Sequence, residues 1–168
     1  MRFSPKQKQA LKLLKNGELK RLNIFEGSVR SGKPDISMVI WGVWVAGAPK
    51  ESAYLMAGKT MNTLKRNVLE PMTEIFGNRF TYNTTKKEAR LFGRRIYLEG
   101  AANASAEGKI RGMTLHGAYC DELTLFDESF FVMLLSRLSE RGAKLIATTN
   151  PDNPSHWVKR DYLDNPKI

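Results

Sequence analysis

Short apolar runs, each bounded by polar or turn-forming residues, recur along this chain of 168 residues. Runs of about four to six residues have the length and continuous apolar character of strands buried in a parallel sheet. Four segments fit this description: 22–25, 53–57, 117–120 and 144–149. Longer segments between them carry apolar residues at helical spacing. The pattern therefore predicts an α/β fold with a mostly parallel sheet sandwiched by helices.

Helix signals lie between these runs. The first helix has the clearest start, because Ser4 can be its N-cap, Pro5 its first residue and Gln7 the partner in a capping box. The third is expected to be interrupted or bent near Pro71, and Asp127 can cap the fourth. The four predicted helices span residues 4–16, 33–46, 60–76 and 128–140.

Two further segments depart from this alternation. Residues 80–98 alternate polar and apolar side chains and contain two turn signals, which predicts a small antiparallel excursion of the sheet. Residues 101–112 are rich in Gly, Ala and Ser, and we expect a loop there.

A glycine-rich loop follows the first strand and precedes a helix. Its sequence, Gly-Ser-Val-Arg-Ser-Gly-Lys, matches the phosphate-binding pattern G-x-x-x-x-G-K. Backbone N–H groups and the helix dipole would hold phosphate there, and Lys33 would reach the terminal phosphates. A chance match is the alternative, although the flanking strand and helix argue against it. The predicted nucleotide-binding residues are Gly27, Ser28, Val29, Arg30, Ser31, Gly32, Lys33 and Pro34.

The residue after this loop breaks the pattern. The motif normally continues with Ser or Thr, whose hydroxyl ligates Mg²⁺. Pro34 has neither a hydroxyl nor a backbone N–H. Its ring fits the first turn of a helix, so the fold should survive while the metal ligand is lost.

An acidic pair, Asp121 and Glu122, follows the buried strand 117–120. In the company of a phosphate-binding loop, Asp121 would hold Mg²⁺ directly or through water. Glu122 would polarise the attacking water as a general base. The alternative is an acidic turn leading to the helix cap at Asp127.

Polar residues also follow the last buried strand, in the sequence Thr148-Thr149-Asn150-Pro151. Ligands of parallel sheets bind beyond the carboxyl ends of the strands. Thr149 and Asn150 are therefore expected near the γ-phosphate, where they could sense its loss. An ordinary turn is the alternative, since Asn-Pro commonly ends an element.

The chain carries 27 Lys and Arg against 17 Asp and Glu, a net charge of +10. This excess favours nucleic acid as a partner, with a basic surface kept for solubility as the alternative. Lys86-Lys87, Arg94-Arg95 and Lys159-Arg160 are candidate contacts. A single cysteine, Cys120, excludes an internal disulfide. The longest apolar stretch, 38–48, is shorter than the ~20 residues of a membrane span, so no membrane partner is expected.

In their order along the chain these motifs resemble the large terminase subunit of tailed bacteriophages. The resemblance rests on Ser4–Gln7, Gly27–Lys33, Lys109–Thr114, Tyr119–Glu122, and Thr148–Pro151 followed by His156–Lys159. It implies a P-loop NTPase of the additional-strand, catalytic-glutamate type that uses ATP and Mg²⁺ to drive packaging of double-stranded DNA into a procapsid. It also implies a portal protein, a small terminase subunit and a homo-oligomeric ring as partners, in the cytoplasm of the bacterial host.

The same resemblance suggests roles for individual residues. Gln7 would contact adenine, a role that competes with the capping box. Arg30 would act in catalysis with Lys33 and Glu122 by stabilising the transferred phosphoryl group, a solvated side chain being the alternative. The segment that couples hydrolysis to movement would be Thr149 and Asn150. Arg111 could be a second arginine, a DNA contact or a plain surface residue.

Two features depart from the family's pattern. Because Pro34 removes a metal ligand, we expect weak binding of Mg·ATP and slow or absent hydrolysis, which leaves a degenerate nucleotide- or DNA-binding module as the alternative. Family members also carry a C-terminal nuclease domain, and nothing in residues 1–168 corresponds to it, so a single ATPase domain is expected over 1–168. A helicase-like translocase would require a second motor domain and helicase signatures.

Overall fold

A seven-stranded sheet forms the centre of the computed structural model, which describes residues 3–26, 35–149 and 156–158. Its strand order is β1-β7-β6-β2-β5-β4-β3. The first four neighbouring pairs are parallel, and β3 and β4 extend one edge as an antiparallel pair. The strands are β1 (Leu22–Glu26), β2 (Ala53–Gly58), β3 (Phe80–Asn83), β4 (Glu88–Leu91), β5 (Arg94–Gly100), β6 (Gly117–Cys120) and β7 (Lys144–Thr149). The mostly parallel sheet and its antiparallel excursion are thus confirmed.

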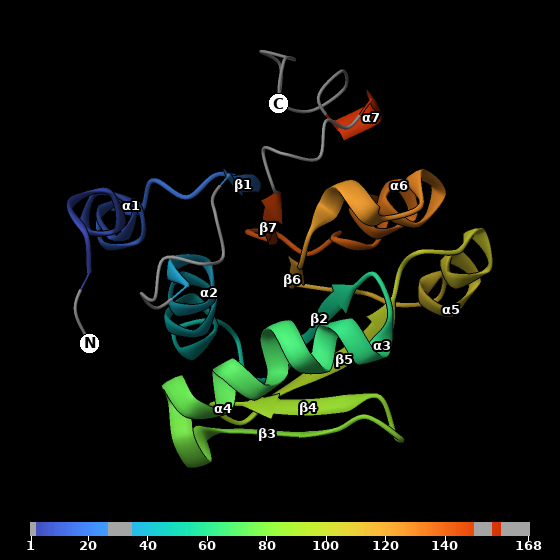
Figure 1. The fold of residues 1–168 in the computed structure, drawn as a ribbon, viewed down its shortest axis with the longest axis horizontal. Helices are drawn as coiled ribbons and strands as arrows, with labels where there is room; N and C mark the ends of the chain where they lie inside the picture. Colours follow the sequence, from blue (N-terminus) through green and yellow to red (C-terminus); the bar gives the residue numbers. More distant parts are fainter. Residues whose placement is uncertain (1–2, 27–34, 150–155, 159–168) are drawn as a thin grey trace.

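Helices cover both faces of this sheet (Figure 1). The α-helices are α1 (Pro5–Lys15), α2 (Ile36–Ala46), α3 (Met61–Leu64), α4 (Glu70–Phe76), α5 (Glu107–Ile110), α6 (Glu128–Arg137) and α7 (His156–Val158). The shorter turns are the π-helix η1 (Lys65–Leu69) and the 3₁₀ helices η2 (Gly77–Arg79), η3 (Ala104–Ala106) and η4 (Leu123–Leu125).

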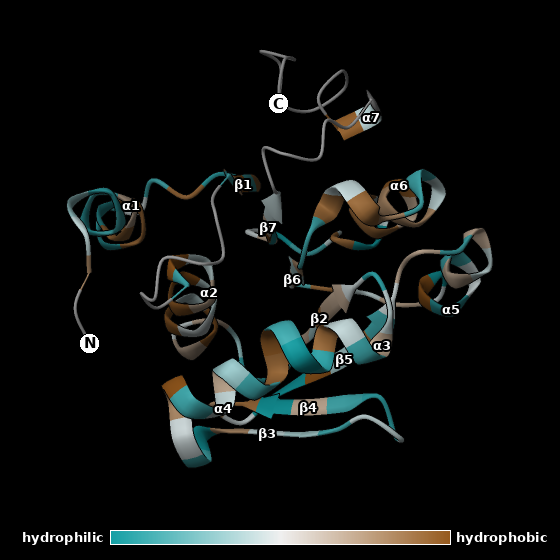
Figure 2. Cartoon of the chain, in the orientation of Figure 1, coloured by the Kyte–Doolittle hydropathy of each residue, from teal (hydrophilic) through white to brown (hydrophobic). Residues whose placement is uncertain are grey.

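Alternate residues of the central strands pack into two separate cores, one on each face of the sheet. In β2, Tyr54 and Met56 pack on one side with α2, η1 and α4, while Leu55 and Ala57 pack on the other with α5 and α6. Both sides are fully buried there, which explains why this strand is continuously apolar. Figure 2 shows the matching hydrophobic character of α2.

The expected interruption before Pro71 takes the form of a π-helical turn. Residues 61–76 run through α3, η1 and α4 as one nearly continuous helical segment, with Pro71 in the first turn of α4. Proline cannot donate a hydrogen bond to the carbonyl four residues earlier. The wider π turn at Lys65–Leu69 accommodates that missing bond.

The expectation of a loop over 101–112 is wrong in part. Residues 104–110 form η3 and α5, because Ala106 and Ile110 lie four residues apart and both are buried against α6. The fourth helix also ends at Arg137 rather than near residue 140, with Leu138 at its C-cap. Within the described ranges, no helix has the length and apolar character needed to cross a membrane.

Candidate nucleotide site

Three strand ends meet at one edge of the sheet. β7 lies between β1 and β6 and is parallel to both, so all three carboxyl ends face the same way. Glu26, the last residue of β1, pairs with Thr149, the last residue of β7. The glycine loop begins at residue 27, directly after β1. Only β7 therefore lies between the acidic pair that follows β6 and the glycine loop that follows β1.

Thr148 connects the acidic pair to β7. Its hydroxyl accepts a hydrogen bond from the Glu122 backbone N–H at 3.0 Å and donates one to the Asp121 carboxylate at 3.4 Å. Successive side chains of a strand point to opposite faces, so Thr149 points away from this contact and is buried. The sequence pointed to Thr149 and Asn150. The structure shows that Thr148 makes the contact, and Asn150 lies outside the described residues.

The backbone of Glu122 adopts a left-handed conformation, with φ 54° and ψ 66°. This region is unfavourable for a residue with a side chain and is concentrated at functional sites. The bond from its N–H to Thr148 holds the conformation in place. The Glu122 carboxylate in turn accepts a hydrogen bond from the Thr124 hydroxyl at 2.7 Å, which orients it. A carboxylate held in this way at a strand end is suited to positioning a water molecule.

Asp121 sits in an environment that disfavours its negative charge. Burial raises the pKa of its carboxyl to about 6, and the charges of Asp35 and Glu122 act in the same direction. Hydrogen bonds from Asn67 and Thr148 act in the opposite direction. A bound cation would relieve this unfavourable charge. Asp121 therefore has the electrostatic setting expected of a metal ligand.

Asp35 begins the helix that follows the glycine loop. Its carboxylate caps α2 by accepting a hydrogen bond from the Ser37 N–H at 2.9 Å. The Ser37 hydroxyl also bonds to the Asp35 carboxylate and lies 2.7 Å from the buried hydroxyl of Tyr119. Burial, followed by the charges of Asp35 and Asp121, raises the pKa of Tyr119 well above its usual value. This polar network ties the first turn of α2 to β6.

The donor set suits Mg²⁺. That ion prefers oxygen ligands and is commonly held by one or two carboxylates together with water and phosphate oxygens. Among the described residues, no group of three or more His, Cys, Asp or Glu side chains could hold a metal ion by itself. An Mg²⁺ ion at Asp121 would therefore need further oxygen ligands, such as phosphate and water. Cys120 offers no competing thiolate, because burial raises its pKa far above neutrality.

Gln7 forms the predicted capping box. Its side-chain oxygen accepts a hydrogen bond from the Ser4 N–H at 2.9 Å, and its own N–H donates to the Ser4 hydroxyl at 3.2 Å. The proposed contact with adenine stays a prediction. The candidates of the glycine loop, Gly27, Ser28, Val29, Arg30, Ser31, Gly32, Lys33 and Pro34, lie outside the described residues.

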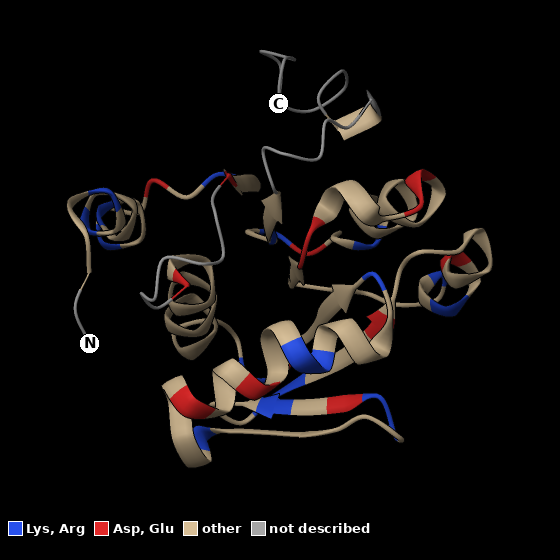
Figure 3. Cartoon of the chain, in the orientation of Figure 1, with Lys and Arg blue, Asp and Glu red and all other residues tan. Residues whose placement is uncertain are grey.

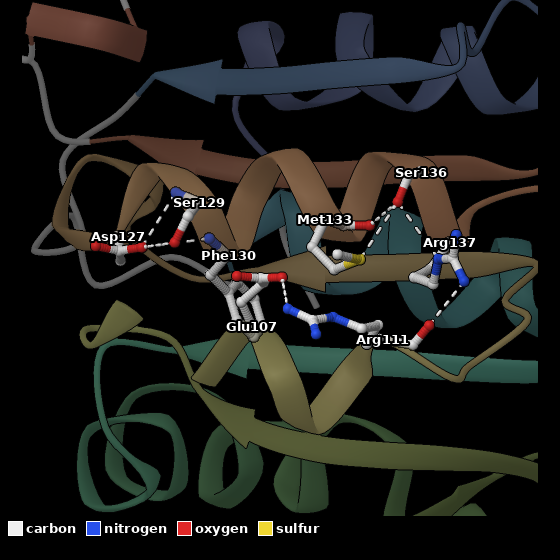
Figure 4. Close-up of polar contacts among 8 residues, drawn as sticks. All are labelled: Glu107, Arg111, Asp127, Ser129, Phe130, Met133, Ser136 and Arg137. Carbon is white, nitrogen blue, oxygen red and sulfur yellow. Dashed lines mark hydrogen bonds and ion pairs between the residues drawn. The ribbon is translucent and has the colours of Figure 1, made fainter. Parts of the chain in front are cut away.

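Arg111 lies at the end of α5, beside α6, on the face of the sheet opposite α2 (Figure 4). Its guanidinium pairs with Glu107 one helical turn earlier, at 2.5 Å, and its carbonyl accepts a hydrogen bond from Arg137 at 2.7 Å. Asp127 caps α6, as the sequence indicated, by accepting from the backbone N–H groups of Ser129 and Phe130. These contacts are structural, and Asp127 is thus a helix cap.

Sequence reasoning overlooked the contributions of Thr148, Thr124 and Asp35. Each is a single polar residue beside a more conspicuous motif, and only its position in the fold distinguishes it. A signal existed for Asp35, because an acidic residue directly before an apolar helical run is a typical N-cap.

Comparisons with known proteins agree with this geometry. A family model described as phage terminase large subunit matches residues 21–168. The large terminase of a thermophilic bacteriophage is 31% identical, with a TM-score of 0.83 over 98% of this chain and 43% of that one. The complex of the same terminase with ADP matches at 30% identity with a TM-score of 0.84, over the same shares of the two chains. This chain thus spans less than half the length of that terminase.

A more distant likeness concerns the fold alone. The large terminase ATPase domain of Thermus phage P74-26 is 17% identical, with a TM-score of 0.53 over 86% of this chain and 64% of that one. No match was found among curated proteins. The family model covers most of the chain, and the predicted P-loop NTPase fold with its additional strand agrees with the order β1-β7-β6. The chain therefore belongs to the phage terminase large subunit family.

Proposed function

We propose that this chain is the ATP-binding and ATP-hydrolysing motor domain of a DNA-packaging machine. The observation that carries the proposal is the link from Thr148 at the end of β7 to Asp121 and Glu122 after β6, beside the strand that leads into the glycine loop. The large terminase of the thermophilic bacteriophage has been solved in complex with ADP and with ATP-γ-S, which supports nucleotide as the ligand class.

Each site residue then has a chemical role. The glycine loop and Lys33 would hold the phosphates, and Asp121 would hold Mg²⁺. When bound, this ion neutralises part of the phosphate charge. Glu122 would accept a proton from the attacking water, and Arg30 would stabilise charge on the transferred phosphoryl group.

Coupling would run through the end of β7. Thr148 contacts the Asp121 carboxylate and the Glu122 backbone. A displacement of either residue would therefore shift the end of β7, which continues into Thr149 and Asn150. Movement of that segment would transmit the loss of the γ-phosphate to a DNA-contacting surface.

Pro34 favours a second candidate, a degenerate module that binds nucleotide or DNA with little turnover. The missing hydroxyl would weaken the hold on Mg²⁺. Asp35 does not offer an obvious replacement, because its carboxylate already caps α2 and bonds to Ser37.

ATP turnover by the wild type, Pro34→Thr and the double variant Pro34→Thr/Glu122→Gln separates these candidates. We expect Pro34→Thr to raise turnover at least ~tenfold, because it restores a metal ligand, and Glu122→Gln to abolish the gain. Equal rates for the wild type and Pro34→Thr would refute the role given to Pro34. Absence of nucleotide binding in both would refute the motor proposal.

The remaining partners follow from the same proposal. They are double-stranded DNA, a portal protein, a small terminase subunit and further copies in a ring, in the cytoplasm of a bacterial host. Sedimentation of the protein with and without a non-hydrolysable ATP analogue would test the ring.

A further inference from the structure

Most of the excess positive charge lies at one end of the chain. Residues 1–21 contain seven Lys and Arg against one acidic residue, Glu18, which is a net charge of +6 out of +10 for the whole chain. The family model matches residues 21–168, so this basic segment lies almost entirely outside the matched region. The region matched by the family model therefore leaves out most of this charge, although the solved large terminase covers 98% of the chain.

The structure turns this segment into an exposed helical face. Lys8, Lys12 and Lys15 are spaced i, i+4, i+7 on α1, so they lie along one side of the helix, and all three are exposed. The apolar side chains of α1, from Ala10 to Leu14, pack against the core shared with α2. Figure 3 shows basic and no acidic residues on α1. We call Lys8, Lys12 and Lys15 the lysine stripe.

No carboxylate of the described residues neutralises the lysine stripe. Within the part of the chain that the structure describes, none of its three ammonium groups lies within 4.0 Å of an acidic side chain. Of the basic pairs suggested by the sequence, Lys159-Arg160 lies outside the described residues, and each of the other two contains a residue that differs in this respect or is buried. Lys87 pairs with Glu99 at 3.4 Å, and Arg95 pairs with Glu88 at 3.0 Å.

Arg94 is also excluded as a contact. It is 7% exposed, and its guanidinium donates to the Ala48 carbonyl at 2.6 Å, so it serves the core. Other exposed lysines without an ion pair to a described residue, such as Lys50, Lys65 and Lys86, are dispersed over separate elements. The lysine stripe thus combines three exposed lysines without a described ion pair on one side of a single helix.

We propose that the lysine stripe of α1 binds the phosphate backbone of double-stranded DNA, an inference that rests on the proposed packaging function. From Lys8 to Lys15 the helix rises about 10 Å, which spans roughly three phosphates of one strand. The exposed side of the stripe carries no large apolar side chain that would enter a lipid bilayer. The apolar side of α1 packs on α2, so the helix holds the lysine stripe on the outer surface of the domain.

Salt-dependent binding tests the stripe directly. Fluorescence anisotropy would follow the whole chain binding a labelled duplex of about 30 base pairs from ~0.05 to ~0.3 M KCl. The test variant is Lys8→Gln/Lys12→Gln/Lys15→Gln, and the control is Lys50→Gln/Lys65→Gln/Lys86→Gln, which has the same net charge. Each neutralised phosphate contributes about 0.9 to the slope of log affinity against log salt.

We expect the test variant to bind at least ~tenfold more weakly at ~0.1 M KCl, with a slope reduced by about 2 to 3, and the control to change little. Replacing the three stripe residues by Arg should preserve binding. Equal losses in both Gln variants would overturn the inference, because net charge alone would then explain binding. Unchanged DNA binding in the test variant would overturn it as well. So would a test variant that loses binding to vesicles containing phosphatidylserine while it keeps binding to DNA.

Circular dichroism and nucleotide binding of the same variants complete the test. The test variant should keep the wild-type melting temperature and affinity for ADP, because the stripe contacts neither the core nor the site. The single change Lys12→Gln, with an expected slope change of about 0.9, provides a second measurement if the triple variant unfolds. Absence of nucleotide binding in the wild type would refute the proposed function. The DNA-binding measurements would still show whether the lysine stripe binds DNA.

Discussion

Removing the charge of Asp121 should stabilise the protein while damaging its site. Burial raises the pKa of this carboxyl from 3.8 to about 6, so the folded state opposes its ionisation. The difference corresponds to about 3 kcal/mol at neutral pH by linkage. Because the carboxylate is only partly buried and the Asn amide fits its hydrogen bonds imperfectly, we expect Asp121→Asn to gain about 1–3 kcal/mol near neutral pH.

The sign of the pH dependence follows from the same pKa. Between about pH 4 and pH 6 the folded protein keeps a proton on Asp121 that the unfolded chain has released. The contribution of this group to stability is therefore lost as the pH rises through that window. The advantage of Asp121→Asn should be near zero below about pH 4 and complete above about pH 6.

Urea unfolding at about pH 4 and about pH 7.5, with EDTA present, measures this effect. Glu51→Gln, which removes an exposed carboxylate elsewhere, is the matched control. If Asp121→Asn is no more stable than the wild type at the higher pH, or if its advantage is the same at both pH values, then the folded state does not oppose ionisation of Asp121. Added Mg·ADP should narrow the difference, because a cation favours the charged carboxylate of the wild type.

Three further predictions concern the same fold. Glu122→Gly should be about 1 kcal/mol more stable than Glu122→Ala in urea unfolding, because glycine adopts φ 54° without strain; equal stabilities would contradict this. Thr148→Val should cost about 1–2 kcal/mol and lower ATP turnover, whereas Thr148→Ser should do neither; a harmless Val would show that the hydroxyl bonds do not matter. Gly42→Ala should lower stability by about 1–3 kcal/mol, because its Cβ would lie 2.0 Å from the Phe76 ring, while Gly108→Ala, with open space, should be neutral; the reverse order in thermal melts would contradict this.

Local chemistry was readable from the sequence where a short motif has one dominant structure. The capping box of Ser4 and Gln7 formed as predicted, and Asp127 caps its helix. Helix ends were predicted less well. The end of α6 at Arg137 depends on how far its side chains pack against the core, and the sequence does not show this. The helix at 104–110 was missed because its small residues suggest a loop until α6 supplies a surface for Ala106 and Ile110.

The site was predicted in outline and not in its contacts. Asp121 and Glu122 stood out because two carboxylates follow a buried strand. Thr148 did not, because nothing in the sequence says that β7 inserts between β1 and β6 or which of two threonines faces β6. The left-handed backbone of Glu122 is likewise a product of tertiary packing.

Binding of Mg·ADP by the wild type and by Lys33→Ala shows whether the glycine loop forms a nucleotide site, with Lys50→Ala as the control for charge. Titration calorimetry should give a dissociation constant at least ~tenfold weaker for Lys33→Ala and an unchanged one for Lys50→Ala, because only Lys33 belongs to the phosphate-binding loop. Equal affinities in all three proteins, or no heat of binding in the wild type, would contradict the assignment of a nucleotide site to this edge of the sheet.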